Sequence, residues 1–209
     1  MPNDGHYRGG NARNQVKGRK MVEREERDRE VYVDGPAHES GPAVSVERLV
    51  HRERLLRDLR TQGEEAGITL IVAPDGFGKT TLLVQRVAEV RSRIERGSAR
   101  MLDLEGLDEV QAYESVKRLS EDLDPHMRPL IALDNLTTLR EHGIEAMVGL
   151  LRSMRGEGFE IVVTCRPSNR AFVAAMGDSY KITAQSLLVK PREYPAWARK
   201  LSIASGLDV

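Results

Sequence analysis

A strand, a glycine-containing loop and a helix follow one another directly near residues 68–94, and this order constrains the fold more than any other feature of the chain. Ile68–Ala73 is apolar and rich in β-branched residues, and a helical pattern runs from Lys79 to about Ile94. Between them, residues 73–80 read APDGFGKT, which matches G-x-x-x-x-G-K-[ST] everywhere except at the first position, where Ala73 replaces Gly. The pattern in this context predicts a phosphate-binding loop in an α/β sheet.

The residue types of the loop suit a polyphosphate. A loop that enters a helix directs backbone N–H groups at one small volume, and Gly76 and Gly78 allow close approach of the backbone and positive φ. Lys79 offers an ammonium to the β- and γ-phosphates, and Thr80 offers a hydroxyl to Mg²⁺. We therefore expect ATP and Mg²⁺ to bind here. The expected contacts are Ala73, Pro74, Asp75, Gly76, Phe77, Gly78, Lys79, Thr80 and Thr81. The alternative is an ordinary strand–turn–helix with a chance GKT.

A second candidate element is the segment 128–136, RPLIALDNL. An apolar strand that ends in Asp134 is typical of a Walker B element, whose carboxylate holds the Mg²⁺ water shell together with Thr80. In the alternative interpretation, Asp134 caps a helix predicted at 138–154.

Asn135 and Arg166 bear on catalysis. ATPases with an additional strand between the loop strand and the Walker B strand usually carry an acidic residue near the place of Asn135, to polarise the attacking water. Asn can orient water but cannot accept a proton at neutral pH, so hydrolysis should be slow or should depend on another group. Arg166 ends the strand EIVVTCRP and could read the γ-phosphate, or it could be a surface arginine. Cys165 is expected to pack rather than react.

Further strands and helices alternate along the chain, which predicts right-handed crossovers and a mainly parallel five-stranded sheet in a three-layer P-loop sandwich. A helix capped by Ser45 is expected first, closed by Gly63 and Gly67. The other expected strands are 100–104, 129–134, 159–164 and 181–189, and the other expected helices are 107–121, 138–154, 168–176 and 192–204.

The first 42 residues contain little to bury, and Asp34–Pro42 is rich in turn residues. We expect a disordered tail and linker at 1–42 and one P-loop domain at 43–209. The basic tail residues 8–20 would give nucleic acid only weak, salt-sensitive contacts.

Composition narrows the functional classes. Lys and Arg total 32, as do Asp and Glu, so net charge gives no reason to expect attraction to nucleic acid or a membrane. A single Cys fits a reducing compartment, and no apolar run approaches the roughly 20 residues of a spanning helix. We expect a soluble, cytoplasmic protein without a membrane partner.

Four segments together resemble the ATPase domain of STAND-class signalling ATPases. They are VERLVHRERLLRDL, ITLIVAPDGFGKTTLL, PLIALDN and EIVVTCRP, and they are most similar to the large LuxR-family ATP-dependent regulators of the maltose-regulon activator type. In that family the loop commonly begins with Ala. The resemblance implies a loop strand lying between the last strand and the Arg166 strand, and roles for Lys79, Thr80, Asp134 and Arg166 in an ATP-set on/off state.

The resemblance ends near residue 190, and Asn135 departs from it. The DNA-binding and inducer-sensing regions of that family have no counterpart in the sequence, so those functions are not expected. We expect ATP/ADP binding and a protein partner or self-association. The function is then a slow or partner-stimulated ATPase switch, or a non-hydrolysing, nucleotide-dependent interaction module. A GTPase is disfavoured because no [NT]-K-x-D element is found, and a small-molecule kinase because the connection from 84 to 128 is short.

Overall fold

The computed structural model of the 209-residue chain describes residues 30–31, 44–45, 49–93, 99–136 and 138–205. Its strands are β1 (Glu30–Val31), β2 (Val44–Ser45), β3 (Ile68–Val72), β4 (Ala99–Asp103), β5 (Leu130–Leu136), β6 (Glu160–Cys165) and β7 (Tyr180–Thr183). Its α-helices are α2 (Glu53–Ala66), α3 (Lys79–Arg93), α4 (Glu109–Glu121), α5 (Glu141–Glu157), α6 (Arg170–Ala175), α7 (Ala184–Leu187) and α8 (Tyr194–Ser205). Short 3-10 turns lie at Pro125–Met127 and Pro191–Glu193.

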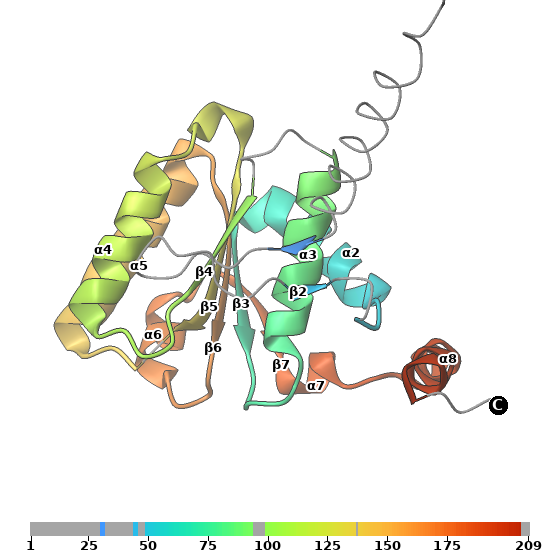
Figure 1. The fold of residues 1–209 in the computed structure, drawn as a ribbon. Helices are drawn as coiled ribbons and strands as arrows, with labels where there is room; N and C mark the ends of the chain where they lie inside the picture. Colours follow the sequence, from blue (N-terminus) through green and yellow to red (C-terminus); the bar gives the residue numbers. More distant parts are fainter. Residues whose placement is uncertain (1–29, 32–43, 46–48, 94–98, 137, 206–209) are drawn as a thin grey trace, which may run out of the picture.

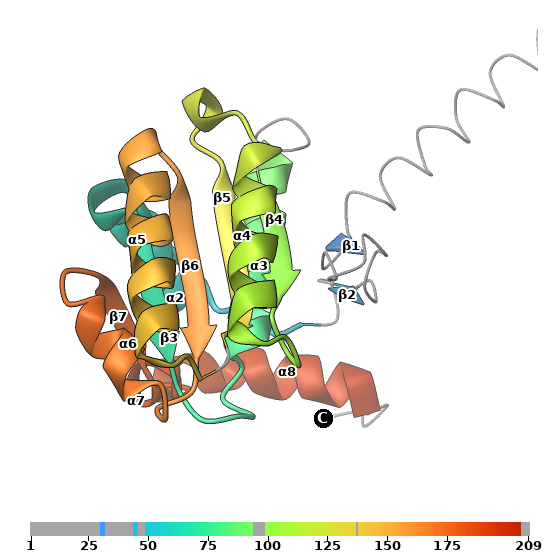
Figure 2. The ribbon, with the colours of Figure 1, turned by 90° about the vertical axis from the view of Figure 1, so that its left-hand side faces the viewer.

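Strands β3 to β7 form one parallel sheet in the order β4-β5-β6-β3-β7. The loop strand β3 therefore lies between the last strand and the strand that leads to Arg166, as the resemblance implied. Helices α4, α5 and α6 cover one face of the sheet, and α2 and α3 cover the other (Figures 1 and 2). The predicted three-layer α/β architecture is confirmed.

Side chains of β3 point alternately to the two faces of the sheet and contribute to the core on each face. Ile68 and Leu70 pack with residues of α4, α5 and α6, whereas Ile71 and Ala73 pack with α2 and α3. All four side chains are at most 2% exposed. Because β3 is buried on both faces, the point where it ends at Val72 is fixed relative to both helical layers.

The helix before β3 begins later than predicted. Ser45 lies in β2 and caps no helix; α2 starts at Glu53, and Gly63 lies within it, while Gly67 ends it in the left-handed region with φ 69°. The reason is a tertiary contact, because the side chain of Gln85 in α3 holds the preceding segment. It donates to the Val50 carbonyl at 2.7 Å and accepts from the Arg52 N–H at 3.1 Å.

The last strand is shorter than predicted. Residues 181–189 were expected to be one strand, but β7 ends at Thr183 and α7 follows. Thr183 pairs with Val72, the last residue of β3, so a longer strand would find no partner on that side. Helix α7 instead buries Leu187 against the core beside α2 and α3.

The other predicted helices and strands are confirmed with ends shifted by a few residues, including the terminal helix, here α8. The β1 strand falls inside the segment predicted as tail and linker, and it pairs antiparallel with β2. Residues 1–29 and 32–43, with the rest of that prediction, lie outside the described residues. None of the helices that the structure describes is long and apolar enough to cross a membrane.

Candidate functional site

The loop between β3 and α3 has the backbone that its glycines predict. Gly76 and Gly78 have φ of 80° and 78°, which favour glycine over residues with a Cβ. A Cβ built at either position would meet no described atom within 4 Å. The glycines are therefore required by the backbone conformation, and open space lies beside the loop.

Thr80 and Asp134 meet at the end of this loop. Thr80 Oγ1, in the first turn of α3, donates to Asp134 Oδ2 at 2.5 Å. The other oxygen of Asp134 accepts a hydrogen bond from the hydroxyl of Thr164 in β6. Asp134 is only 1% exposed. Its carboxylate is held between two hydroxyl groups, one from α3 and one from β6.

The register of β5 breaks next to Asp134. The pairing of β5 with β6 shifts between Leu133 and Leu136, and Asn135 adopts a left-handed φ of 55°. Leu133 and Leu136 consequently pack in the same core beside α5, although strict alternation would place them on opposite faces. Helix α5 has Arg140 at its N-cap, so the alternative in which Asp134 caps it is wrong.

Asn135 is engaged by its neighbours. Its amide Nδ2 donates to Oδ1 of Asp103, the last residue of β4, at 3.0 Å, and its backbone N–H donates to Thr164 Oγ1 at 3.0 Å. Sequence reasoning assigned no role to Asp103 or Thr164. The spacing of β4 could have indicated Asp103, because it follows an apolar strand just as Asp134 does.

The two basic residues of the site share one carboxylate. Arg166 donates from Nε and Nη2 to Asp75 at 3.1 and 2.9 Å, and Lys79 Nζ lies 3.5 Å from Asp75 Oδ1. Lys79 also donates to the carbonyl of Pro74 at 2.9 Å. The hydrogen bonds from Arg166, with the nearby charge of Lys79, hold the pKa of the Asp75 carboxyl below its ordinary value.

A pocket of about 480 Å³ lies beside the loop. Its lining includes Val50, Arg52, Phe77, Thr81, Leu187 and Trp197. Arg52 is buried: its Nη2 donates to the carbonyl of Leu187 at 2.5 Å, its guanidinium carbon lies 5.6 Å from the centre of the Trp197 ring, and its Nε has no partner among the described residues. The volume is in the range of small-molecule sites. Only the loop side of this pocket was predicted, because Arg52, Leu187 and Trp197 come from three segments that only the fold brings together.

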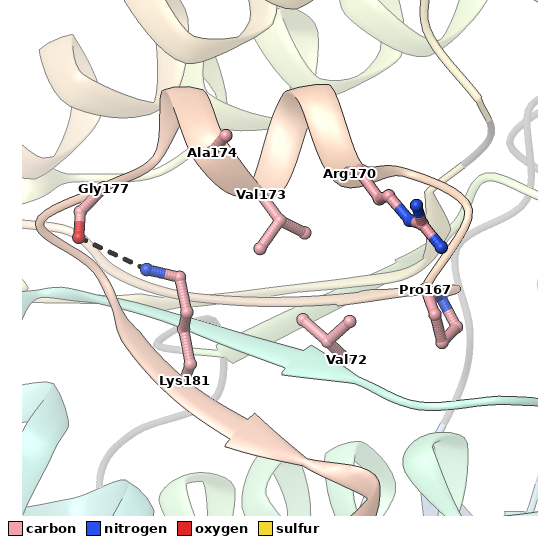
Figure 3. A pocket seen from close by; sticks show the side chains of 7 residues that line it. All are labelled: Val72, Pro167, Arg170, Val173, Ala174, Gly177 and Lys181. Atoms are coloured by element: carbon pink, nitrogen blue, oxygen red, sulfur yellow. Dashed lines mark hydrogen bonds between the residues drawn. The ribbon is translucent and has the colours of Figure 1, made fainter.

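A second pocket, of about 460 Å³, lies on the face of the sheet covered by α6 (Figure 3). Its lining includes Val72, Pro167, Val173 and two basic residues, Arg170 and Lys181, the latter donating to the Gly177 carbonyl at 3.2 Å. It shares no lining residue with the pocket beside the loop, so the two are separate.

The oxygen ligands of the site fit Mg²⁺. Thr80 and Asp134 offer a hydroxyl and a carboxylate, and Mg²⁺ is usually bound by one or two such groups with its remaining positions held by water and phosphate. No cluster of three or more His, Cys, Asp or Glu in the described part of the chain could hold a metal. Cys165 is buried, as expected.

Comparison with known proteins finds similarity of fold alone. No family model and no curated protein matches the chain. Domain III of the Thermotoga maritima replication initiation protein DnaA is similar with a TM-score of 0.53 and 15% identity, over 78% of this chain and 75% of that one. A DnaA bound to AMPPCP and single-stranded DNA gives a TM-score of 0.54 at 15% identity, and AMPPCP-bound DnaA from Aquifex aeolicus gives 0.51 at 14%.

Each of these two matches covers 78% of this chain, which spans 56% and 55% of the two DnaA chains. The similarities show that this chain and these DnaA structures share an α/β fold, at low sequence identity.

Proposed function

We propose that this chain binds ATP with Mg²⁺ at the loop 73–81 and acts as a slow, nucleotide-dependent switch. The observation that carries the proposal is the contact between Thr80 and Asp134, 2.5 Å apart at the end of a glycine-containing loop. A hydroxyl at the start of the loop helix and a carboxylate at the end of a neighbouring strand are the two protein ligands of Mg²⁺ in P-loop enzymes. The AMPPCP, an ATP analogue, in two DnaA structures of similar fold supports the choice of nucleotide.

The remaining groups have roles that follow from their chemistry. Backbone N–H groups of the loop, with Lys79, would hold the β- and γ-phosphates, and Arg166 would contact the γ-phosphate. Bound Mg²⁺ would neutralise charge on the β- and γ-phosphates. The nucleobase would enter the pocket next to Phe77, which Trp197 and Arg52 also line.

Slow hydrolysis follows from Asn135. Attack of water on the γ-phosphorus requires that a proton leave the water, and an amide cannot accept it. The amide of Asn135 is moreover already donating to Asp103. We therefore propose low turnover, with stimulation by a protein partner or by self-association, in line with the resemblance to STAND-class ATPases and LuxR-family regulators. A cytoplasmic location is part of this proposal.

The test is release of inorganic phosphate from ATP, measured with wild type, Lys79→Ala and Asp134→Asn, each checked for folding by circular dichroism. Slow Mg²⁺-dependent release that both substitutions abolish is the expected result. ATP-dependent thermal stabilisation without phosphate release, under all conditions, would favour the alternative of a non-hydrolysing interaction module. Absence of both phosphate release and stabilisation would contradict the proposal.

A further inference from the structure

Asp75 lies in the loop, and its negative charge is opposite to the charges of its neighbours Lys79 and Arg166. Its carboxylate accepts two hydrogen bonds from Arg166, in a bidentate arrangement, and forms an ion pair with Lys79. Lys79 and Arg166 are the two cations proposed above to contact the γ-phosphate. In this structure both are paired with a carboxylate of the protein itself.

The two cations differ in exposure. The side chain of Lys79 is 6% exposed, whereas those of Asp75 and Arg166 are 62% and 61% exposed. Ion pairs between exposed side chains are weak because water and salt screen them. A phosphate group, with more charge and three acceptor oxygens, can therefore replace the Asp75 carboxylate on Arg166 and Lys79.

We propose that Asp75 is a specificity-determining residue, whose carboxylate competes with the γ-phosphate for Lys79 and Arg166 and so sets the relative affinity for ATP and ADP. This inference rests on the proposed ATP site. ADP lacks the competing group, so Asp75 keeps its contact with Arg166 when ADP binds. ATP must displace Asp75, which lowers the affinity for ATP more than the affinity for ADP. In the ATP-bound protein the Asp75 carboxylate is therefore no longer paired with Arg166, whereas in the ADP-bound protein it is.

The chain offers a matched control in Asp178. Its side chain is 60% exposed and lies 3.5 Å from Arg152 and 3.3 Å from Arg155, so it too pairs with arginine at the surface. Asp178 precedes β7 and Asp75 follows β3, and these strands are parallel. The two aspartates therefore lie at opposite ends of the sheet.

The experiment is calorimetric titration of Mg²⁺-ATP and Mg²⁺-ADP into wild type, Asp75→Asn and Asp178→Asn. Asp75→Asn should raise the affinity for ATP about tenfold and that for ADP less than about threefold, and Asp178→Asn should change neither. Asp75→Ala, which removes the hydrogen-bonding group as well as the charge, should give the same ratio of ATP to ADP affinity as Asp75→Asn.

Other outcomes overturn the inference. If Asp75→Asn changes both affinities equally, Asp75 acts only through the general charge of the loop. If it weakens ATP binding, Asp75 assists the nucleotide rather than competing with it. If wild type binds nucleotide but the ratio stays fixed in the variants, only this inference fails. If neither wild type nor Asp75→Asn binds nucleotide, the proposed function fails with it.

Discussion

The hydroxyl of Thr80 donates a hydrogen bond to Asp134 across 54 residues of sequence, at 2.5 Å, and thereby joins the first turn of α3 to the end of β5. Thr164 donates to the other oxygen of the same carboxylate. The two proposed Mg²⁺ ligands are thus in direct contact, and the protein holds them with its own hydrogen bonds. This arrangement makes the site sensitive to residues that would never touch the nucleotide.

Thr164 is the first such residue. It is fully buried; its hydroxyl donates to Asp134 and accepts from the backbone N–H of Asn135. Thr164→Val should lower the free energy of unfolding by about 1–3 kcal/mol, because it leaves buried polar groups without partners. Thr164→Ser keeps the hydroxyl and is the matched control. Urea unfolding measures both, and equal stabilities of the two variants would contradict the role of this network.

The contact of Asn135 with Asp103 leads to a second prediction. Asn135→Asp would place two carboxylates in contact where an amide now donates at 3.0 Å. The two like charges repel and the hydrogen bond is lost, so the variant should be less stable than wild type. We expect a loss of about 1 kcal/mol at pH 7, measured by urea unfolding.

The double variant Asn135→Asp/Asp103→Asn exchanges the two groups and should restore stability. It also places a proton acceptor at position 135 without repulsion. Its phosphate release should therefore exceed that of wild type, by up to about a hundredfold. A double variant as unstable as Asn135→Asp alone would show that the contact with Asp103 is not what selects an amide here.

Cys165 gives a prediction on pH. Burial raises the pKa of its thiol to about 11 from an ordinary value of 9.0, so the unfolded chain loses the proton at lower pH than the folded one. Stability should therefore fall between pH 9 and 11 by about 2 kcal/mol more in wild type than in Cys165→Ala. Unfolding by urea across this range measures the difference. Parallel curves for the two proteins would contradict the burial argument, as would rapid labelling of the native thiol at pH 7.

The pocket beside the loop gives a prediction on the nucleobase. Trp197→Ala should weaken ATP binding about tenfold and leave the binding of tripolyphosphate unchanged, because tripolyphosphate has no base to place against the ring. Tyr194→Ala is the matched control, since this aromatic residue also belongs to α8 but is 56% exposed and does not line the pocket. Unchanged ATP binding in Trp197→Ala, or an equal loss of affinity for ATP and tripolyphosphate, would contradict this placement of the base.

Local patterns predicted the parts of the site that are contiguous in sequence. The loop follows a buried strand and precedes a helix, and Asp134 and Arg166 each follow a run of apolar residues. The strands and the helix around these residues lie where the pattern predicted them. The place of the loop strand β3 between β6 and β7 was implied by a family resemblance, and the sheet has this arrangement.

Tertiary contacts decided the rest. Gln85 keeps residues 50–52 out of the helix that periodicity placed there, and the end of β3 at Val72 limits the length of β7. The wall of Arg52 and Trp197 joins segments more than a hundred residues apart. No local pattern of apolar residues reports such contacts, because each depends on which elements the sheet brings together.

The most direct test of the ATP site is calorimetric titration of ATP, ADP and GTP, in the presence of Mg²⁺, into wild type and Lys79→Ala. Wild type should bind ATP and ADP and should bind GTP more weakly. Its affinity for ATP should fall when Mg²⁺ is removed. Lys79→Ala, confirmed as folded by its melting transition, should bind ATP at least about tenfold more weakly. No heat of binding and no ATP-dependent rise in melting temperature for wild type at millimolar ATP would contradict the account.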